Sequence, residues 1–573
     1  MENNGRAQMN SDSETKEDTK EVASEDAPVR RHHWALFVAA AILVPVVILG
    51  VIELSLRIAG VGYSTDLLVP CTVRGTPASC YNLFFAAPFF PAGMVQTPRL
   101  YSIPATKPPG TFRIFVLGES AAMGDPDSAY GFSRYLEVML RERYPSIRFE
   151  IVNTGSVAIN SHVELPIVKG LADQHPDVFI SYSGNNEVVG PYGPGTVLTA
   201  SAMSMPVVRS SIFYHSSRIG QFVTRLGTQK REWRGMEMFL DKQVPASSPL
   251  MKYVYANFEQ NLRDIFAVAH KAGAKVIVAT VATNLKDCAP FASQHRDGLK
   301  AEDLRSWSAL VQQGNELEAA NSPTEALKLY LSAARIDDEY AELEFRIARC
   351  LWATGDYKAA KEHFSRAQDL DTLRFRADSR INEINRSVAS SSPGVVLVDA
   401  DKILSDASPD GIIGSDFVYE HVHLTPEGNY LLARAMFLEI AKDLPQDSAH
   451  SADPDVLSEA DCERLLAFTR YDRSRLAAEM LDRLQKPPFT TQLNHSEQVF
   501  RMAAKAQRSD ETPNDTAAQY QWAITRSPED AMLRLRFGMF LYPYNRAAAA
   551  EQLGMAQPWD GYPVFLPDGT QIR

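Results

Sequence analysis

Cysteine is scarce in this chain, with 5 among 573 residues, and no two cysteines form a CxxC pair with metal-site spacing. The low count excludes a scaffold held together by many disulfides. An excess of basic residues is also lacking, because the formal net charge is -12. Since a phosphate-binding surface needs clustered Lys and Arg, we do not expect nucleic acid as a partner.

Apolar residues are plentiful by comparison. They make up 45% of the chain, and charged residues 22%, which is ordinary for a globular protein. The length predicts two to four structural units. The first of these is a polar segment, residues 1–33, which has too little apolar material for a core and is predicted to be a disordered cytoplasmic tail.

A long apolar run follows this tail. Residues 34–52 carry no charge, and as a helix these nineteen residues would span about 28 Å, close to the hydrocarbon thickness of a bilayer. A cleaved signal peptide would be shorter and nearer the N-terminus. A buried soluble helix is the alternative. We expect residues 34–56 to cross the plasma (inner) membrane once. Arg30 and Arg31 precede the run, which favours a cytoplasmic N-terminus and an extracytoplasmic remainder.

Residues 57–109 are predicted to be a connecting segment. They contain Cys71 and Cys80, close together in sequence. In an oxidising compartment these two residues could form a disulfide. Two free thiols remain the alternative.

Short apolar runs alternate with amphipathic stretches from residue 110 onward. This pattern predicts a parallel sheet covered by helices on both faces, built from residues 110–300 and 391–445. In such sheets a ligand binds at the carboxyl ends of the strands. The five expected strands are residues 112–117, 148–153, 177–182, 275–281 and 395–398.

Residues 301–390 interrupt this series with an all-helical pattern. Residues 323–337 align with residues 357–371 at an offset of 34, the period of tetratricopeptide repeats. An ordinary helical hairpin is the alternative. Residues 455–573 are again helix-rich, and residues 520–530 resemble the end of a degenerate repeat. The aligned pairs are Ala326 and Ala360, Tyr330 and Phe364, Ala333 and Ala367, and Asp337 and Asp371.

Small polar residues follow three of the expected strands. Ser120 comes directly after the first strand, in Gly-Glu-Ser, where a serine would be exposed at the edge of the sheet. Gly155 follows the second strand and Asn186 the third, and both offer uncharged hydrogen-bond donors. Such donors can form an oxyanion hole, although glycine and asparagine also simply make turns.

The remaining group is a histidine far along the chain. His423 lies on the loop before a predicted helix start at Thr425–Pro426, and Glu420 lies three residues before it. A neutral imidazole can accept a serine proton, and a carboxylate on its other nitrogen fixes the tautomer. His421, His423 and Glu420 could instead bind a metal ion. No further His or Cys cluster completes such a site, so no metal is expected.

The blocks Gly-Glu-Ser, Asn-x-Gly, Gly-Asn-Asn-Glu and acid-x-x-His occur in the order typical of the SGNH/GDSL hydrolases. The chain resembles that superfamily over residues 110–300 and 391–445. The resemblance implies a flavodoxin-like three-layer α/β fold and an ester hydrolase with no cofactor. It implies Ser120 as nucleophile, His423 as base and Glu420 as orienting acid. The Ser120 and Gly155 amides and the Asn186 side chain would form the oxyanion hole.

One departure from the family bears on catalysis. Glutamate stands at positions 119, 187 and 420, where the family usually has aspartate. The longer acid at 420 must fold back to reach His423, and Asp416 on the same loop is a candidate substitute.

These features together predict a membrane-anchored extracytoplasmic serine esterase. Its expected substrate is an acylated molecule, such as an acetylated polysaccharide or another envelope polymer. The repeat-like helices could bind a protein partner. Two alternatives remain: an acyltransferase that resolves the same acyl-enzyme with a sugar hydroxyl, and a catalytically inert scaffold.

Overall fold

The computed structural model describes residues 29–201, 204–227, 231–445, 456–507 and 509–572. They fall into two compact units, one ending at Gly62 and the other beginning at Tyr63, which are described separately. Residues 1–28 of the predicted disordered tail lie outside the described residues. Helix α1 (Val29–Ile58) begins five residues before the predicted membrane span of residues 34–56.

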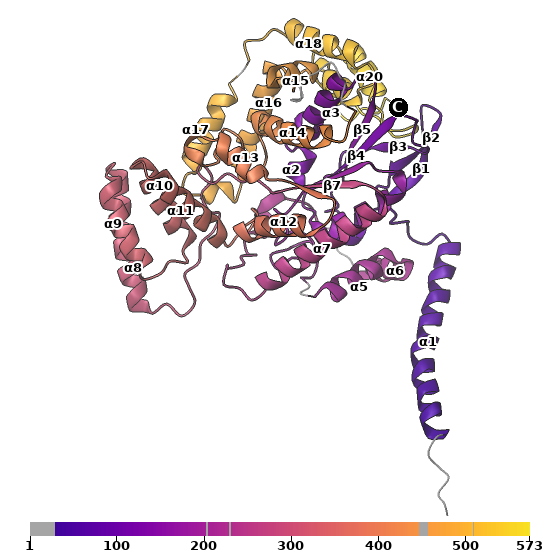
Figure 1. The fold of residues 1–573 in the computed structure, drawn as a ribbon, viewed down its shortest axis with the longest axis horizontal. Coiled ribbons are helices and arrows are strands. Elements are labelled where there is room, and N and C mark those ends of the chain that lie inside the picture. The colour runs from indigo at the N-terminus through magenta and orange to yellow at the C-terminus, as the bar shows by residue number, and fades with distance from the viewer. Residues whose placement is uncertain (1–28, 202–203, 228–230, 446–455, 508, 573) are drawn as a thin grey trace, which may run out of the picture. The chain divides into compact units, whose positions relative to one another are not determined.

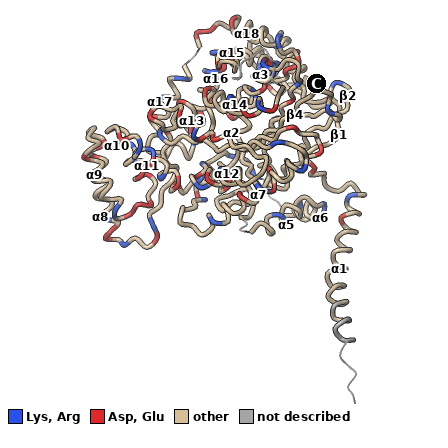
Figure 2. Tube along the Cα trace, in the orientation of Figure 1, with Lys and Arg blue, Asp and Glu red and all other residues tan. Residues whose placement is uncertain are grey.

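Helix α1 makes up most of the described part of the first unit. Its segment Leu36–Ile58 is long and apolar enough to cross a membrane, and none of it is buried against protein. Figure 2 shows the helix without charged residues over most of its length. Glu53 and Arg57, near its C-terminal end, form an ion pair at 2.9 Å. The helix is compatible with a single-pass anchor or a signal sequence.

The second unit opens with a small antiparallel sheet that the sequence did not predict. It comprises β1 (Leu68–Val73), β2 (Thr76–Tyr81) and β3 (Ser102–Pro104). The segment 57–109 is therefore more than a connector. Cys71 on β1 and Cys80 on β2 form a disulfide, which decides the alternative left open by the sequence.

A five-stranded parallel sheet lies at the centre of the second unit. The strands are ordered β5-β4-β6-β7-β8, so the first strand in sequence lies second in space. This is the flavodoxin-like order of doubly wound α/β folds. The parallel sheet expected from the apolar runs is confirmed. Its strands are β4 (Thr111–Gly118), β5 (Arg148–Asn153), β6 (Val178–Tyr182), β7 (Lys275–Ala279) and β8 (Val395–Val398).

Helices cover both faces of this sheet (Figure 1). Residues 114–117 of β4 are at most 1% exposed, as expected for a parallel strand buried on both sides. One face carries α3 (Phe132–Arg143), α13 (Ala400–Ala407) and α14 (Pro426–Ala441). The other carries α4 (Ser161–Leu171), α7 (Met251–Lys271) and α12 (Ser379–Ser391). The connection between β6 and α7 adds α5 (Met205–Ser216) and α6 (Arg218–Gly227).

The chain between β7 and α12 forms two helical hairpins. Their helices are α8 (Ala301–Ala319), α9 (Pro323–Ala334), α10 (Ala341–Ala353) and α11 (Tyr357–Leu370). The aligned small and aromatic residues of α9 and α11 are all buried, where they let each helix approach its partner. Helix α12 packs on α7 and the sheet as a crossover helix, so the lobe ends near residue 370 rather than at the predicted residue 390.

The aspartates at the end of each aligned segment tie these hairpins to the loop after β7. Asp337 Oδ2 lies 2.7 Å from His295 Nδ1. Asp371 Oδ2 accepts the Phe291 N–H at 2.9 Å. The 34-residue repetition thus places two equivalent acids along one loop.

The described C-terminal residues, 456–507 and 509–572, form six α-helices that pack on the sheet domain. Tyr130, in the segment after α2 (Ser120–Met123), is hydrogen-bonded through its hydroxyl to that of Tyr520 at 3.1 Å. Arg536 donates to Asp127 in the same segment, at 2.5 Å. The helices are α15 (Glu459–Leu465), α16 (Arg470–Leu484), α17 (His495–Lys505), α18 (Pro513–Arg526), α19 (Ala531–Leu541) and α20 (Arg546–Met555).

Candidate active site

A sharp turn at the end of β4 presents Ser120. Gly118 has φ +143°, and a Cβ there would lie 2.2 Å from the carbonyl oxygen of Tyr182 on the neighbouring strand. Only glycine fits this close approach between β4 and β6. Glu119 is then extended, and Ser120 is the first residue of α2. The serine is half-buried at the carboxyl edge of the sheet, the expected position for a ligand site.

His423 lies on a loop that folds back on itself. Val418 pairs with Leu424 in an isolated antiparallel bridge, and the Tyr419 N–H donates to the His423 carbonyl at 2.8 Å. Thr425 then caps α14 by accepting the Gly428 N–H at 3.2 Å. The histidine is therefore fixed by backbone pairing on one side and by a helix start on the other.

These two segments bring the predicted residues together. His423 Nε2 lies 2.8 Å from Ser120 Oγ, although the two residues are 303 positions apart in sequence. His423 Nδ1 is hydrogen-bonded to Glu420 Oε1. The side chains form a continuous serine–histidine–glutamate chain, in which each group contacts the next in the order that a catalytic triad requires.

The longer acid at position 420 is accommodated by the backbone of its own loop. Glu420 Oε2 accepts the N–H groups of residues 421, 422 and 423, at 2.5, 3.1 and 3.2 Å. Oε1 is left for His423. Burial raises the pKa of this carboxyl, but the charges of His423 and His421 outweigh it and hold the pKa well below its usual value. Asp416, the candidate substitute, is exposed to solvent.

A second carboxylate, missed by the sequence analysis, reaches the same imidazole. Asp125 Oδ2 lies 3.0 Å from His423 Nε2, the nitrogen that also faces Ser120. Arg483 of α16 holds this acid, with Nη2 at 3.2 Å from Asp125 Oδ1. Arg483 Nη1 also lies 3.5 Å from Glu420 Oε1. The C-terminal helices thus contribute an arginine to the site.

These charges set the protonation of His423. Burial is the largest single influence and lowers its pKa, but the negative charges of Glu420 and Asp125 together outweigh burial. The pKa of His423 is therefore raised, and Arg483 offsets part of that rise. The pKa of Asp125 is lowered, because His423 and Arg483 outweigh its burial.

Two of the three predicted oxyanion-hole residues, Asn186 and Gly155, differ in what their donors contact. Asn186 Nδ2 donates one hydrogen to the Ile159 carbonyl at 3.1 Å, which leaves its second hydrogen. The Gly155 N–H donates to the Asn153 side chain at 2.9 Å, so it is already engaged. Three residues later, Ala158 has φ 60°, and no described residue accepts a hydrogen bond from its N–H.

Three carboxyl groups are buried behind the nucleophile. Glu119 accepts the N–H groups of residues 184, 185 and 186 at 3.0–3.1 Å, which links the turn after β4 to the Asn186 loop. Burial and the neighbouring Glu187 raise the pKa of Glu119 to about 8. Burial raises the pKa of Glu187 to about 7, although Ser161 donates to it twice, at 2.8 Å. Burial, and to a smaller extent the negative charge of Glu119, raises the pKa of Glu164 well above its usual value. The glutamates at 119 and 187 thus serve the framework of the site.

The residues considered for a metal ion do lie together. One ligand atom from each of Glu420, His421 and His423 falls within 4.8 Å of the others. Both nitrogens of His423 face other groups, Glu420 on one side and Ser120 on the other. A metal ion would have to displace one of them, so the arrangement favours the triad.

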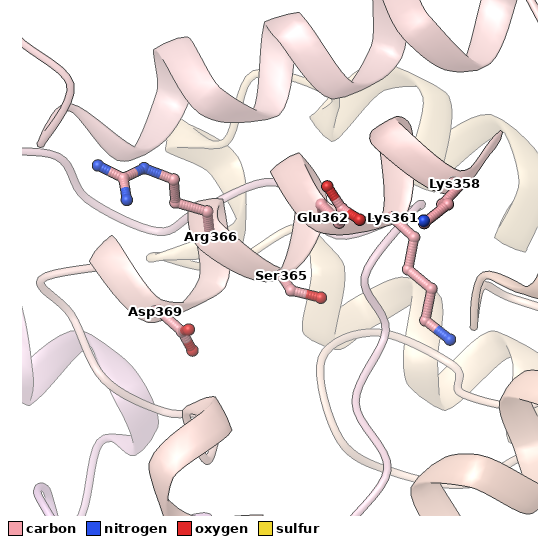
Figure 3. A pocket seen from close by; sticks show the side chains of 6 residues that line it. All are labelled: Lys358, Lys361, Glu362, Ser365, Arg366 and Asp369. Atoms are coloured by element: carbon pink, nitrogen blue, oxygen red, sulfur yellow. The ribbon is translucent and has the colours of Figure 1, made fainter. Parts of the chain in front are cut away.

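A broad hollow on α11 offers no comparable chemistry. It is lined by Lys358, Lys361, Glu362, Ser365, Arg366 and Asp369. Figure 3 shows these side chains pointing away from one another rather than toward a common point. Lys361 donates to Ser405 at 2.5 Å, and Arg366 pairs with Asp338 at 2.6 Å, so both cations are already engaged.

Comparisons with known proteins add a likeness in fold alone. No protein-family model and no curated protein matches this chain. A solved acetyl xylan esterase is similar over 57% of this chain and all of its own, at 11% identity and a TM-score of 0.28. An alpha/beta hydrolase enzyme from the metagenome of Lake Arreo, Spain, is similar over 58% of this chain and 95% of its own, at 12% identity and a TM-score of 0.24. At these TM-scores the likeness carries no functional argument, which must come from the site itself.

Proposed function

We propose that this chain is a serine ester hydrolase of the SGNH type. The observation that carries the proposal is the hydrogen-bonded chain from Ser120 through His423 to Glu420 at the carboxyl edge of the sheet. Serine is a poor nucleophile unless an adjacent base accepts its proton. The chain offers that base within hydrogen-bond distance, already oriented by an acid.

The proposed reaction has two steps. Ser120 Oγ attacks the ester carbonyl carbon while its proton passes to His423 Nε2, and the alcohol then leaves with that proton. Water attacks the resulting acyl-serine in the same way, which releases the acid and restores the serine. Glu420 keeps its hydrogen bond to Nδ1 throughout and stabilises the imidazolium that forms in each step.

Asp125 has a separate role in this proposal. A neutral His423 that donates from Nδ1 to Glu420 has a lone pair at Nε2, which accepts from Ser120. Asp125 can accept a hydrogen bond from Nε2 only after that nitrogen has been protonated. Asp125 therefore stabilises the imidazolium, the form that exists once the serine has given up its proton.

The tetrahedral intermediate needs donors for its oxyanion. The second hydrogen of Asn186 Nδ2 and the Ser120 N–H are the donors inferred first. Gly155 is the third donor inferred from the sequence, but its N–H is already held by Asn153; the Ala158 N–H, which has no acceptor among the described residues, is a further candidate. Ala158 has a positive φ although it is not glycine, and this unusual conformation could not be predicted from the sequence.

The proposal includes a location and a substrate class. Helix α1 would anchor the chain in the plasma membrane, with the catalytic unit outside the cytoplasm, where acylated envelope polysaccharides are available. The hairpins α8–α11 have the 34-residue period of tetratricopeptide repeats and would bind a protein partner.

Hydrolysis of a small aryl acetate tests the proposal. Ser120→Ala and His423→Ala should each lower kcat/KM by a factor on the order of 10³ or more, because triad members act as a unit. Ser415→Ala, which removes the hydroxyl of another half-buried serine, is the control and should leave the rate unchanged. Wild-type turnover no faster than Ser120→Ala, on a panel of short acyl esters, would refute esterase activity. Product analysis with and without a sugar acceptor distinguishes hydrolysis from acyl transfer.

A further inference from the structure

Helices α5 and α6 expose an unusual amount of apolar surface. Phe213 of α5 is 78% exposed, and Leu226 of α6 is 76% exposed. Isolated exposed apolar residues are common, but a contiguous group marks an interaction surface. The other members of the group are Val207, Tyr214, Phe222 and Val223.

The same segment lacks negative charge. No Asp or Glu occurs between Glu187 and Glu232, although the whole chain has 70 acidic residues. The basic residues in this interval are Arg209, Arg218, Arg225, Lys230 and Arg231. Exposed apolar side chains together with basic ones on a short helix are the features of a helix that lies in a membrane interface.

Helix α6 is tied to the start of the second unit. The Gln221 side chain accepts the Tyr63 N–H at 2.9 Å and donates to the Tyr63 carbonyl at 3.1 Å. Tyr63 follows the end of α1 at Ile58 by five residues, and five residues span at most about 17 Å. Gln221 therefore binds the segment that connects the second unit to α1 in sequence.

The apolar surface continues onto a neighbouring turn. The rings of Tyr63 and Phe84 stack with centroids 4.7 Å apart, and Phe84 is itself 52% exposed. Leu83 beside it is 43% exposed. Helix α5 packs on the short helix η1 (Ala87–Phe89), which follows this turn.

The pair is also fixed to the catalytic unit. Arg209 of α5 is ion-paired with Asp264 of α7, and Val208 is fully buried. Figure 1 shows α5 and α6 outside α7, as the outermost layer of that side. Only the outward faces of the two helices are free to contact something else.

We propose that α5 and α6, with Leu83 and Phe84, form a docking surface for the anionic lipid bilayer that holds α1. This inference rests on the proposal that α1 spans the membrane. Phe213, Phe222 and Leu226 insert among the lipids, and the exposed side chains of Arg225 and Arg231 meet the headgroups. The catalytic unit then binds the membrane surface through its own side chains.

Quenching of a fluorophore by brominated lipid tests the proposal. The free cysteines Cys288, Cys350 and Cys462 are buried, so a cysteine introduced at the surface can be labelled selectively with bimane. Labelled full-length chains are reconstituted in phosphatidylcholine and phosphatidylglycerol vesicles, with and without bromine on the acyl chains. Phe213→Cys is the probe. Phe500→Cys is its matched control, because Phe500 is 77% exposed on α17. Leu43→Cys reports on α1.

We expect brominated lipid to reduce the emission of bimane at 213 and at 43 at least twofold, and to leave emission at 500 unchanged. Quenching at 43 with none at 213 would overturn the docking surface and leave the membrane anchor intact. No quenching at 43 would refute the proposal that α1 spans the membrane. Docking of α5 and α6 to the bilayer that holds α1 would then be refuted as well.

Discussion

The loop that carries Glu420 and the loop that carries Asp125 each bring a carboxylate to the same imidazole, but they hold it by different means. Glu420 is wholly buried and accepts three N–H groups from its own loop. Asp125 is partly exposed and is held by Arg483, 358 positions away in sequence. One acid is fixed locally, and the other depends on the C-terminal helices.

The C-terminal helices and the inserted helices α8–α11 differ in the same way, in whether they contact the site. The C-terminal helices supply Arg483 to the site, whereas no described residue of α8–α11 contacts the side chains of Ser120, His423 or Glu420 through a hydrogen bond or ion pair. The two regions look alike in sequence but differ in their relation to catalysis. Substitutions at Glu420, Asp125, Arg483 and Arg349 separate their contributions.

The largest effect is expected at the locally held acid. Glu420→Gln removes the charge opposite His423 Nδ1 and should lower kcat/KM on an aryl acetate by a factor on the order of 10³ or more. Glu420→Asp should recover little of this loss, because a shorter side chain cannot reach both the three loop N–H groups and His423. Asp416→Asn is the control on the same loop and should have no effect. Near-normal turnover in Glu420→Asp would show that the loop tolerates either acid.

A smaller effect is expected at the second acid. Asp125 raises the pKa of His423, so Asp125→Asn should lower that pKa. Since only neutral His423 can accept the serine proton, activity rises as pH rises through this pKa. The acidic limb of the kcat/KM profile should therefore move to lower pH, by about one unit. A limb that stays in place would mean that Asp125 does not act on His423.

The smallest effect, with the opposite sign, is expected at Arg483. Its positive charge lowers the pKa of His423, so Arg483→Ala should move the acidic limb to higher pH, by less than about one unit. Arg483→Lys keeps the charge and should restore most of the position of the limb. Arg349→Ala breaks an ion pair with Glu497 at 3.0 Å in the inserted helices and should leave the profile unchanged. A shift of equal size in Arg349→Ala would erase the contrast between the two helical regions.

The sheet could be predicted because its signal is local. Parallel strands are buried on both faces, so each one is a short apolar run that ends in a turn, and β5 and β8 begin and end where the sequence placed them. The small sheet of β1–β3 was missed because its strands are only three to six residues long and each contains a proline, which usually argues against a strand. Helix α12 was assigned to the insertion because amphipathic periodicity does not say which surface a helix covers.

Only the site residues that belong to sequence motifs could be predicted. The residues at strand ends and the acid three positions before His423 are sequence patterns. Asp125 and Arg483 are not, because their pairing depends on how α16 folds back over the loop after α2. Ala158 differs again, since its role depends on a backbone conformation and on an N–H without a described partner.

If Ser120 is an activated nucleophile, as proposed, it reacts covalently with a fluorophosphonate probe. The full-length protein is treated with the probe, digested and examined by mass spectrometry. We expect one major adduct, on the peptide that contains Ser120, and its loss in both Ser120→Ala and His423→Ala. An unlabelled wild-type protein, or labelling that persists in Ser120→Ala, would show that Ser120 is not an activated nucleophile.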